Sequence, residues 1–365
     1  MTKKNKIYFF HPYSGKGGAD LSISRLINGL DHKKYEVDFL SLNYPKIRKK
    51  IKRKINFKIV NSNRTFFSFN EINSYIEKDK NYKKKIFISN QNFANALSTV
   101  FLKKKYNLKI ILFERNHINE LENYKNFSEF FKKNIIKLLI KFFYKKADIV
   151  LTNSKSSSRD LRLLSNANVK TLYNPCFFKL YKKKKKNNKK KIILNVSRFT
   201  DQKDHLTLLK GFKNSKYNNK FLLYLVGYGY NENKLRKYID HHNLNNVKIF
   251  KNRFKLNNFY KKADLFILTS IYEGFPNVLV EAASFRIPII SSNFESGASE
   301  ILLNGSGGTT FEVKNYKKLS NKIDQFYLNE KLFLNKEKIC ANALYRFSNK
   351  KIIKDFNKII NDLSK

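Results

Sequence analysis

The sequence predicts an α/β protein built from two doubly wound parallel-sheet domains. Three observations predict this class. Short apolar runs alternate with stretches of helical periodicity along both halves of the chain. The 365 residues exceed what one typical core holds. A charged segment without an apolar face, KKKKKNNKKK at 182–191, separates the two halves and reads as a linker.

The first half opens with a strand, a helix and a second strand, expected at Ile7–Phe10, Leu21–Leu30 and Val37–Leu42. The segment between the first strand and the helix contains three glycines, Gly15, Gly17 and Gly18. Glycines at this place let backbone N–H groups approach a phosphate at a helix N-terminus. An ordinary flexible turn fits the same residues, and neither a P-loop nor a complete Gly-x-Gly-x-x-Gly fingerprint occurs.

Two further strands are expected at Ile86–Ser89 and Ile110–Phe113. The second runs directly into four polar residues, Glu114-Arg115-Asn116-His117, at the strand end where a parallel sheet gathers functional groups. His117 is therefore a candidate site residue, although a lone histidine in a loop is more often simply solvated. Glu114 and Arg115 could pair with each other.

A basic and strongly apolar helix is expected at Phe130–Ala147, before a strand at Asp148–Thr152. Its apolar residues recur at helical spacing, with six lysines between them: Lys132, Lys133, Lys137, Lys141, Lys145 and Lys146. A helix packed on the sheet is the first interpretation. A helix lying in an anionic membrane surface is the alternative.

The second half repeats the alternation, from Asn174-Pro175 and the basic linker onward. Strands are expected at Ile192–Ser197, Phe221–Val226 and Val247–Phe250, with a helix at Glu232–His241. The second strand enters the turn Gly227-Tyr228-Gly229. An amphipathic tail, Lys350–Leu363, closes the chain.

The most informative stretch is 271–285, IYEGFPNVLVEAASF, between strands expected at Ala263–Ser270 and Ile287–Ser292. Gly274 and Pro276 break the chain, and Asn277 is the expected N-cap of a helix that runs to Phe285. Ligands of doubly wound sheets bind at the carboxyl ends of the strands. Glu273 lies at that end, and Glu281 lies in the second turn of the helix. Because helix side chains tilt toward the N-terminus, the two carboxylates can face one cleft.

Composition limits the location and the partners. The formal charge of +47 fits a nucleic-acid, membrane or anionic-ligand partner, but Lys, Asn, Ile, Phe and Tyr are abundant together, which indicates AT-rich codon usage. Cys176 and Cys340 have no metal or redox spacing. The apolar run near the N-terminus is too short for a signal peptide, and no run of about 18 apolar residues occurs. We therefore expect a cytoplasmic protein.

Three motifs in order resemble the retaining GT-B glycosyltransferases of family 4, the glycosyl transferases group 1. They are Gly17-Gly18-Ala19-Asp20 after the first strand, a strand followed by Arg198 and Lys203, and Glu273-x7-Glu281 within EGFPNVLVEA. The resemblance covers almost the whole chain. It departs at Tyr230, where many members have proline, and at Phe285-Arg286, where many have a small glycine.

The resemblance implies a GT-B fold, with two Rossmann-like domains facing a cleft. It implies an acceptor-side domain at 1–175, a basic linker at 176–191, a nucleotide-sugar-binding domain at 192–345, and a C-terminal helix at 346–365 that crosses back to the first domain.

The resemblance also implies roles for the candidate residues. Glu281 takes the ribose hydroxyls and Glu273 a hydroxyl of the transferred sugar, because an ionised carboxylate is acceptor-only. Arg198 and Lys203 stabilise the leaving diphosphate, helped by the helix N-terminus, so no metal and no cofactor is expected. His117 lies near the sugar and acceptor. The remaining implied binding residues are Gly17, Gly18, Arg253, Gly274, Phe275, Pro276, Asn277, Gly297 and Glu300.

The implied activity is transfer of a hexose or N-acetylhexosamine from a nucleotide sugar, with UDP the expected nucleotide. The implied acceptor is a glycan or a polyprenyl-diphosphate-linked sugar in bacterial surface polysaccharide synthesis (O-antigen, capsule or exopolysaccharide), at the inner face of the plasma membrane. Two other classes stay open. A basic nucleic-acid-binding protein fits the charge, although no RNA- or DNA-binding motif occurs. A catalytically inactive scaffold fits the fold, although Arg198, Lys203, Glu273 and Glu281 are all present.

Overall fold

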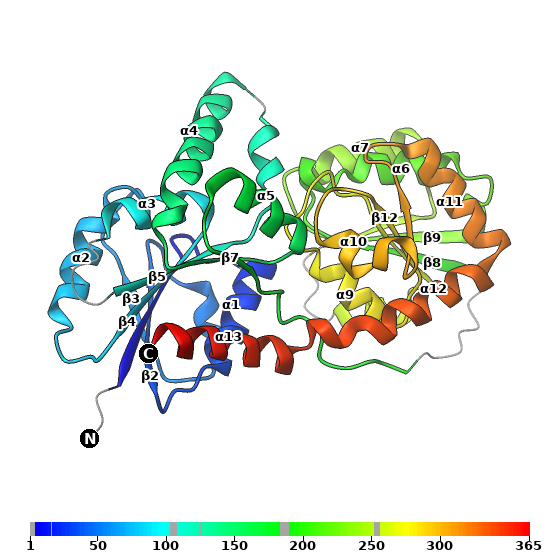
Figure 1. Ribbon diagram of the computed structural model, residues 1–365. Helices are drawn as coiled ribbons and strands as arrows, with labels where there is room; N and C mark the ends of the chain where they lie inside the picture. The colour runs from blue at the N-terminus through cyan, green and yellow to red at the C-terminus, as the bar shows by residue number, and fades with distance from the viewer. Residues whose placement is uncertain (1–3, 16, 103–107, 125, 183–189, 252–255) are drawn as a thin grey trace. The chain divides into compact units, whose positions relative to one another are not determined.

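The chain forms two compact units, each built on one parallel sheet (Figure 1). The first unit comprises Met1–Pro175 and Phe347–Lys365, and the second comprises Cys176–Arg346. The computed structural model describes residues 4–15, 17–102, 108–124, 126–182, 190–251 and 256–365. The prediction of an α/β protein with two Rossmann-like domains is confirmed.

The sheet of the first unit has seven parallel strands in the order β3-β2-β1-β4-β5-β6-β7. Their bounds are β1 Asn5–Phe10, β2 Tyr35–Ser41, β3 Asn56–Ile59, β4 Lys85–Asn90, β5 Leu108–Glu114, β6 Ile149–Thr152 and β7 Val169–Thr171. The central strands are covered on both faces and read as continuous apolar runs, which is why they were predicted. The edge strands β3 and β7 are short and partly polar, and the pattern did not indicate them.

Helices cover both faces of this sheet. The helices α1 (Gly18–Gly29) and α13 (Asn349–Leu363) share one core with Ile7 and Phe9 of β1. The other core contains Tyr8 and Phe10, together with α2 Ser68–Lys78, α3 Asn92–Phe101, α4 Phe127–Phe143 and α5 Lys155–Ser165. Successive strand residues therefore face different helices, as the alternation of side chains along a strand requires.

The C-terminal helix α13 belongs to the first unit. Its buried residues Ile352, Phe356 and Ile360 follow one another at intervals of a helical turn, so one side of the helix is apolar. The ring of Phe356 lies 6.4 Å from that of Phe9 and 5.9 Å from that of Phe113. This packing ties the end of the chain to the centre of the first sheet.

The sheet of the second unit has six parallel strands in the order β10-β9-β8-β11-β12-β13. Their bounds are β8 Lys191–Val196, β9 Phe221–Gly227, β10 Val247–Lys251, β11 Leu265–Leu268, β12 Ile289–Ser292 and β13 Thr309–Phe311. The helices are α6 His205–Asn214, α7 Glu232–His241, α8 Leu256–Lys262, α9 Asn277–Ser284, α10 Gly297–Ile301, α11 Tyr316–Leu328 and α12 Glu330–Asn342. One core joins α6, α7, α11 and α12 to the sheet.

Seven short 3-10 helices connect these elements in the described part of the chain. They are η1 Lys46–Lys50, η2 Ile118–Glu122, η3 Tyr144–Lys146, η4 Asp201–Lys203, η5 Asn218–Lys220, η6 Leu303–Gly305 and η7 Ala343–Phe347. Across the described residues, every helix is too short or too polar to span a membrane.

Candidate active site

The strand order of the second unit defines a topological switch point. Strand β8 pairs with β9 on one side and with β11 on the other, so the chain leaves β8 in one direction and returns on its opposite side. Ligands of open α/β sheets bind at the carboxyl ends of the strands at such a point. Arg198 and Lys203 follow β8, and Glu273 follows β11.

Lys203 and Glu273 meet at this point. The ammonium of Lys203 contacts Oε1 of Glu273, and the hydroxyl of Ser270 donates to the same oxygen at 2.8 Å. The two charged side chains are only 12% and 11% exposed. Charges attract more strongly where water is largely excluded, so the pair holds both side chains in place.

Hydrogen bonds also join the two segments that carry this pair. The N–H of Ile271 donates to the carbonyl of Gln202 at 2.8 Å, and the Gln202 amide donates to the carbonyl of Tyr272 at 2.9 Å. Thr269 donates its hydroxyl to the carbonyl of Lys203 at 2.9 Å. These hydrogen bonds therefore hold the segments after β8 and β11 against each other.

Arg198 is exposed, at the turn that follows β8. Two glycines after β9 allow that turn its position. A Cβ on Gly227 would lie 1.8 Å from the carbonyl oxygen of Ser197, and a Cβ on Gly229 would lie 2.3 Å from that of Phe199. Only glycine permits backbones to approach so closely. The turn that presents Arg198 therefore packs closely against the residues that end and follow β9.

Glu281 lies in α9, with its Oε2 accepting a hydrogen bond of 2.8 Å from the Tyr260 hydroxyl. Tyr260 is buried and stacked on Phe285, with 5.2 Å between ring centroids. Burial and the adjacent Glu281 carboxylate raise the pKa of Tyr260 well above its ordinary value, so the hydroxyl stays a donor. The expected capping role of Asn277 is wrong. Pro276 is the residue before the helix and Asn277 is the first helical residue. The N–H of Asn277 donates to the carbonyl of Phe275 at 3.0 Å.

The structure brings the predicted residue Gly297 against the loop of Glu273. A Cβ on Gly297 would lie 2.6 Å from the ring of Phe275, and its N–H lies 3.5 Å from the carbonyl of Gly274. Glu300 follows in α10, where it is partly buried and its carbonyl accepts from Arg346. Arg253, the remaining candidate of this unit, lies outside the described residues.

Sequence reasoning missed His205. This buried histidine shares a hydrogen bond of 2.9 Å with the hydroxyl of Ser197, which donates to Asn195 at 2.8 Å. Burial, and then the nearby Lys203 ammonium, lower the pKa of His205 to about 3, so the ring is neutral. The side chain of Asn195 donates to the carbonyl of Ile267 at 2.8 Å. These hydrogen bonds connect the end of β8 to β11, close to Lys203. The sequence contains no signal that His205, two residues after Lys203, is buried and hydrogen-bonded to Ser197.

In the first unit, Asp20 organises the glycine loop. Its carboxylate accepts from the N–H groups of Gly15 at 2.7 Å and Gly17 at 3.0 Å, and lies 3.3 Å from Nε2 of His11. Burial opposes ionisation, but His11 and the two N–H groups keep the pKa of Asp20 below its ordinary value. Two of the N–H groups expected to face a phosphate are therefore engaged within the loop. Gly18 is the first residue of α1.

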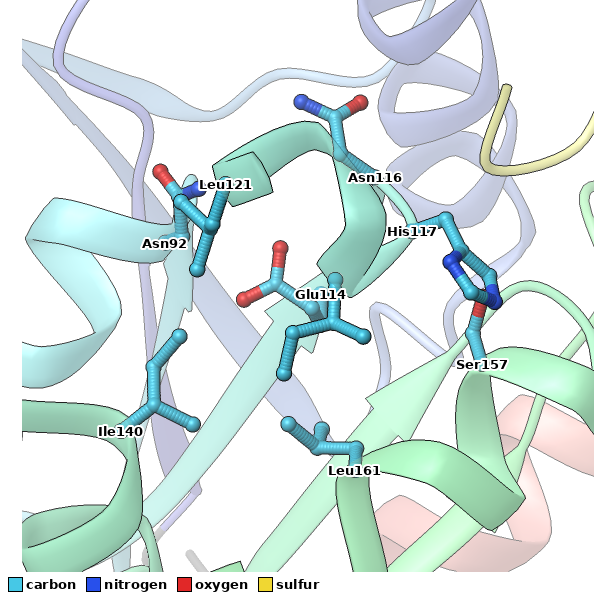
Figure 2. A pocket seen from close by; sticks show the side chains of 9 residues that line it. Asn92, Glu114, Asn116, His117, Leu121, Ile140, Ser157 and Leu161 are labelled. Carbon is cyan, nitrogen blue, oxygen red and sulfur yellow. The ribbon is translucent and has the colours of Figure 1, made fainter. Parts of the chain in front are cut away.

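His117 is buried, not solvated. Its Nε2 lies 3.1 Å from Asp160, and its Nδ1 accepts from the N–H of Asn119 at 3.3 Å. It lines a cavity of about 10 Å³, room for about one water molecule, with Glu114 (Figure 2). Glu114 and Arg115, which could have paired with each other, have different partners. Glu114 accepts from the Tyr144 hydroxyl at 2.7 Å, whereas Arg115 donates to Ser22 of α1, which covers the opposite face of the sheet.

Comparison with known proteins supports one family. The family described as glycosyl transferases group 1 matches residues 177–345. An uncharacterised glycosyltransferase of Methanocaldococcus jannaschii is 30% identical over 302 residues, which cover 73% of this chain and 72% of that protein. The N-acetylgalactosamine-N,N'-diacetylbacillosaminyl-diphospho-undecaprenol 4-alpha-N-acetylgalactosaminyltransferase of Campylobacter jejuni is 27% identical over 288 residues, covering 74% and 73%.

A solved structure shares the fold. HepE of Anabaena, in complex with UDP-glucose, superposes with a TM-score of 0.79 at 16% identity, over 98% of this chain and 99% of that one. At this identity the likeness concerns the fold alone.

Proposed function

The chain belongs to the glycosyl transferases group 1, and from this membership we propose a retaining enzyme that moves a hexose or N-acetylhexosamine from a UDP-sugar. The proposed acceptor is a glycan or polyprenyl-diphosphate-linked sugar of surface polysaccharide. The Campylobacter relative is named for a diphospho-undecaprenol-linked substrate, and HepE was solved with UDP-glucose. The contact of Lys203 with Glu273 at the switch point carries the proposal, because it joins a cation for a diphosphate to an acceptor for a sugar hydroxyl.

The proposed reaction exchanges one bond at the anomeric carbon. The bond from this carbon to the diphosphate oxygen breaks, and the bond to the acceptor oxygen forms on the same face of the sugar. The acceptor proton passes to the leaving phosphate oxygen. Arg198 and Lys203 would stabilise the charge that develops on the diphosphate, so no metal is required. Glu273 would accept from a sugar hydroxyl as the ring gains oxocarbenium character, and no carboxylate nucleophile is needed.

The ribose would bind to Glu281. The Tyr260 hydroxyl donates to this carboxylate and would orient it. Gly274, Phe275, Pro276 and Asn277 would place the N-terminus of α9 beside the diphosphate. Gly297 and Glu300 would border the same group. In the first unit, Gly17, Gly18 and His117 would contribute on the acceptor side.

A panel of nucleotides tests this proposal. We expect UDP and UDP-sugars to raise the melting temperature of the protein more than GDP, ADP or their sugars. NMR of the product formed from an α-linked donor should show an α-linked sugar. Inversion at the anomeric carbon would contradict the retaining mechanism, and tighter binding of oligonucleotides than of any nucleotide would favour the nucleic-acid alternative.

We also propose that α4 contacts an anionic membrane. Of its 17 residues only Ile136 and Ile140 are buried. Five apolar residues at helical spacing form an outward stripe: Phe127 75%, Phe131 56%, Ile135 51%, Leu138 54% and Phe142 52% exposed. Near the start of the helix, the rings of Tyr124 and Phe130 lie 4.9 Å apart, which extends the apolar surface.

The positive charges around this stripe favour an anionic lipid surface as its partner. Exposed lysines lie on α4 and just after it, among them Lys132, Lys141 and Lys145. Cations beside an apolar helix face suit the headgroup region of an anionic bilayer. The inner side of this helix fits the first interpretation, because Ile136 and Ile140 join the core. An enzyme acting on a lipid-linked acceptor at the inner face of the plasma membrane would use the outer side.

A further inference from the structure

Arg115 has an unfilled hydrogen-bonding edge at the carboxyl end of β5. Its Nη1 donates to Ser22 and Asn174, both at 2.9 Å, and the guanidinium lies 4.6 Å from the ring centroid of Phe113. These contacts fix the orientation of the group. Its Nε and Nη2 are shielded from solvent, and within the described residues neither has a hydrogen-bond partner. Because buried polar groups are nearly always bonded, the two unused donors require an explanation.

The unpaired edge has the geometry that binds oxyanions. The N–H groups of Nε and Nη2 run parallel and form the fork that receives carboxylates and phosphates. Two other arginines of this chain use the same edge. Arg162 donates from Nε and Nη2 to the carbonyl of Val169 at 3.2 and 2.8 Å, and Arg236 donates to Glu232 at 3.1 and 3.0 Å. Arg115 has the same edge in place without an acceptor.

The neighbouring carboxylates do not fill this role. Glu114 faces the other side of the sheet and is bonded to Tyr144. Asp20 is bonded within the glycine loop. Burial lowers the pKa of Arg115 to about 10, a shift that Asp20 and Glu114 only partly offset. A shielded cation without a close counter-ion is costly, and a bound anion would remove that cost.

Further unused polar atoms lie at the ends of adjacent strands. Within the described chain, Asn90 Oδ1, Asn153 Oδ1 and His11 Nδ1 are buried without a partner. The parallel register places Asn153 beside Arg115, to whose carbonyl the Asn153 amide donates at 2.7 Å, and places Asn90 beside His11. Strands in a sheet lie about 4.8 Å apart, so these unpaired atoms lie along one short edge of the sheet.

We propose that Arg115 binds an oxyanion of the acceptor, a phosphate or a carboxylate, through Nε and Nη2, while Asn90 and Asn153 accept from nearby hydroxyl groups. Anion binding by this edge depends only on the first unit. Its assignment to the acceptor rests on the proposed function. The acceptor class that results is an anionic glycan, either phosphorylated or containing an acidic sugar.

Thermal unfolding of the full chain in sodium phosphate or sodium glucuronate, at constant ionic strength, tests the site. The background is Arg198→Ala with Lys203→Ala, which removes the cations proposed for the donor diphosphate. We expect one anion to raise the melting temperature saturably, with a midpoint about tenfold or more higher in Arg115→Gln. Arg162→Gln removes an arginine whose same edge is filled by the protein, and it should keep the original midpoint.

Arg115→Lys distinguishes binding by the paired N–H donors from attraction by the positive charge alone. It keeps the positive charge but lacks the paired donors, so it should lose affinity nearly as far as Arg115→Gln. If Arg115→Gln does not fold, the midpoint of Arg115→Lys tests the site in its place. Stabilisation by phosphate would indicate a phosphorylated acceptor, and stabilisation by glucuronate would indicate an acceptor with an acidic sugar. Equal midpoints in the starting protein and in both Arg115 variants would overturn the site.

Transfer kinetics test the assignment to the acceptor. In the otherwise unchanged enzyme, Arg115→Lys should raise KM for an anionic acceptor and leave KM for the donor unchanged. Failure of the proposed function would look different, because a chain without transferase activity would still show the Arg115-dependent midpoint. A raised donor KM with an unchanged acceptor KM would overturn the assignment to the acceptor.

Discussion

The ammonium of Lys203 contacts the carboxylate of Glu273 although the two residues lie 70 positions apart. Each follows a different strand, and the contact closes the switch point of the second sheet. Both side chains are largely shielded, so removal of one leaves a poorly solvated charge on the other. A ligand that binds here therefore meets a cation and an acceptor whose positions depend on each other.

The diphosphate-binding prediction concerns Arg198 and Lys203. Replacement of both by Ala should abolish transfer and weaken UDP binding far more than uridine binding, because only UDP carries the diphosphate charge. Calorimetry with UDP and uridine measures the difference. Lys210→Ala, which removes an exposed lysine of α6, is the control. EDTA should leave activity of the unmodified enzyme largely intact, and a strict requirement for manganese would contradict this role.

The pH-dependence prediction concerns Glu114, whose pKa burial raises from 4.5 to about 7. Between these values the folded state binds more protons than the unfolded state. The free energy of unfolding should therefore fall as pH rises from about 4.5 and level off above about 7, a change on the order of 3 kcal/mol. Glu114→Gln keeps an acceptor for Tyr144 and cannot ionise, so it should remove this slope.

Urea unfolding at several values between about pH 5 and 8 measures the slope. Glu122→Gln, at an exposed position of η2, is the matched control and should leave the slope unchanged. An identical slope in Glu114→Gln would show that the buried carboxyl is already ionised in the folded protein at neutral pH.

The fold was predictable because central strands are buried on both sides and follow a simple pattern. β1, β5 and β11 lie within two residues of the expected runs. Chain order together with parallel pairing then indicates which strand ends carry polar side chains. The edge strand β7 has only three residues, too few for any pattern to mark it.

Partner choice at the sites was less predictable, because it depends on which face each side chain takes. Glu114 and Arg115 are neighbours in the chain and could pair, yet side-chain alternation directs Glu114 to Tyr144 and Arg115 to Ser22, on opposite faces of the sheet. Asn277 has the composition of a cap, but Pro276 takes that position. His205 acts through Ser197, a contact created only when the turn after β8 folds back.

The membrane prediction concerns the outward stripe of α4. Phe131→Ser with Phe142→Ser should reduce flotation of the protein with anionic vesicles and leave the melting temperature nearly unchanged, because both side chains are more than half exposed (56% and 52%). Added salt should also release much of the protein. Leu163→Ser removes an apolar side chain of α5 that is 80% exposed and lies outside the stripe, so it should float like the unmodified protein.

A second control separates the two sides of α4. Ile136→Ser introduces a hydroxyl into the buried side and should lower the melting temperature, with an expected cost of about 2–4 kcal/mol. Flotation of the stripe variant equal to that of the unmodified protein would remove the lipid contact. A collapse of its melting temperature would show that the stripe is covered in the folded protein.

The final prediction assigns different roles to Glu281 and Glu273. Glu281 is proposed to bind the ribose, which does not react, so Glu281→Gln should mainly weaken UDP binding. The expected loss is about 1.5–3 kcal/mol, the range for hydrogen bonds to a charged group. Tyr260→Phe removes the hydroxyl that orients this carboxylate and should produce a smaller loss of the same kind.

Glu273 is proposed to face the sugar, where charge develops in the transition state. Glu273→Gln should therefore lower kcat more than it weakens binding of UDP, which has no sugar. The amide can still accept from Ser270, whereas the ion pair with Lys203 is lost, so some change in UDP affinity is expected through that lysine. Calorimetry with UDP and steady-state kinetics for both variants measure the two effects. If Glu273→Gln weakened UDP binding as much as Glu281→Gln did, with kcat unchanged, the carboxylate would serve the nucleotide and not the transferred sugar.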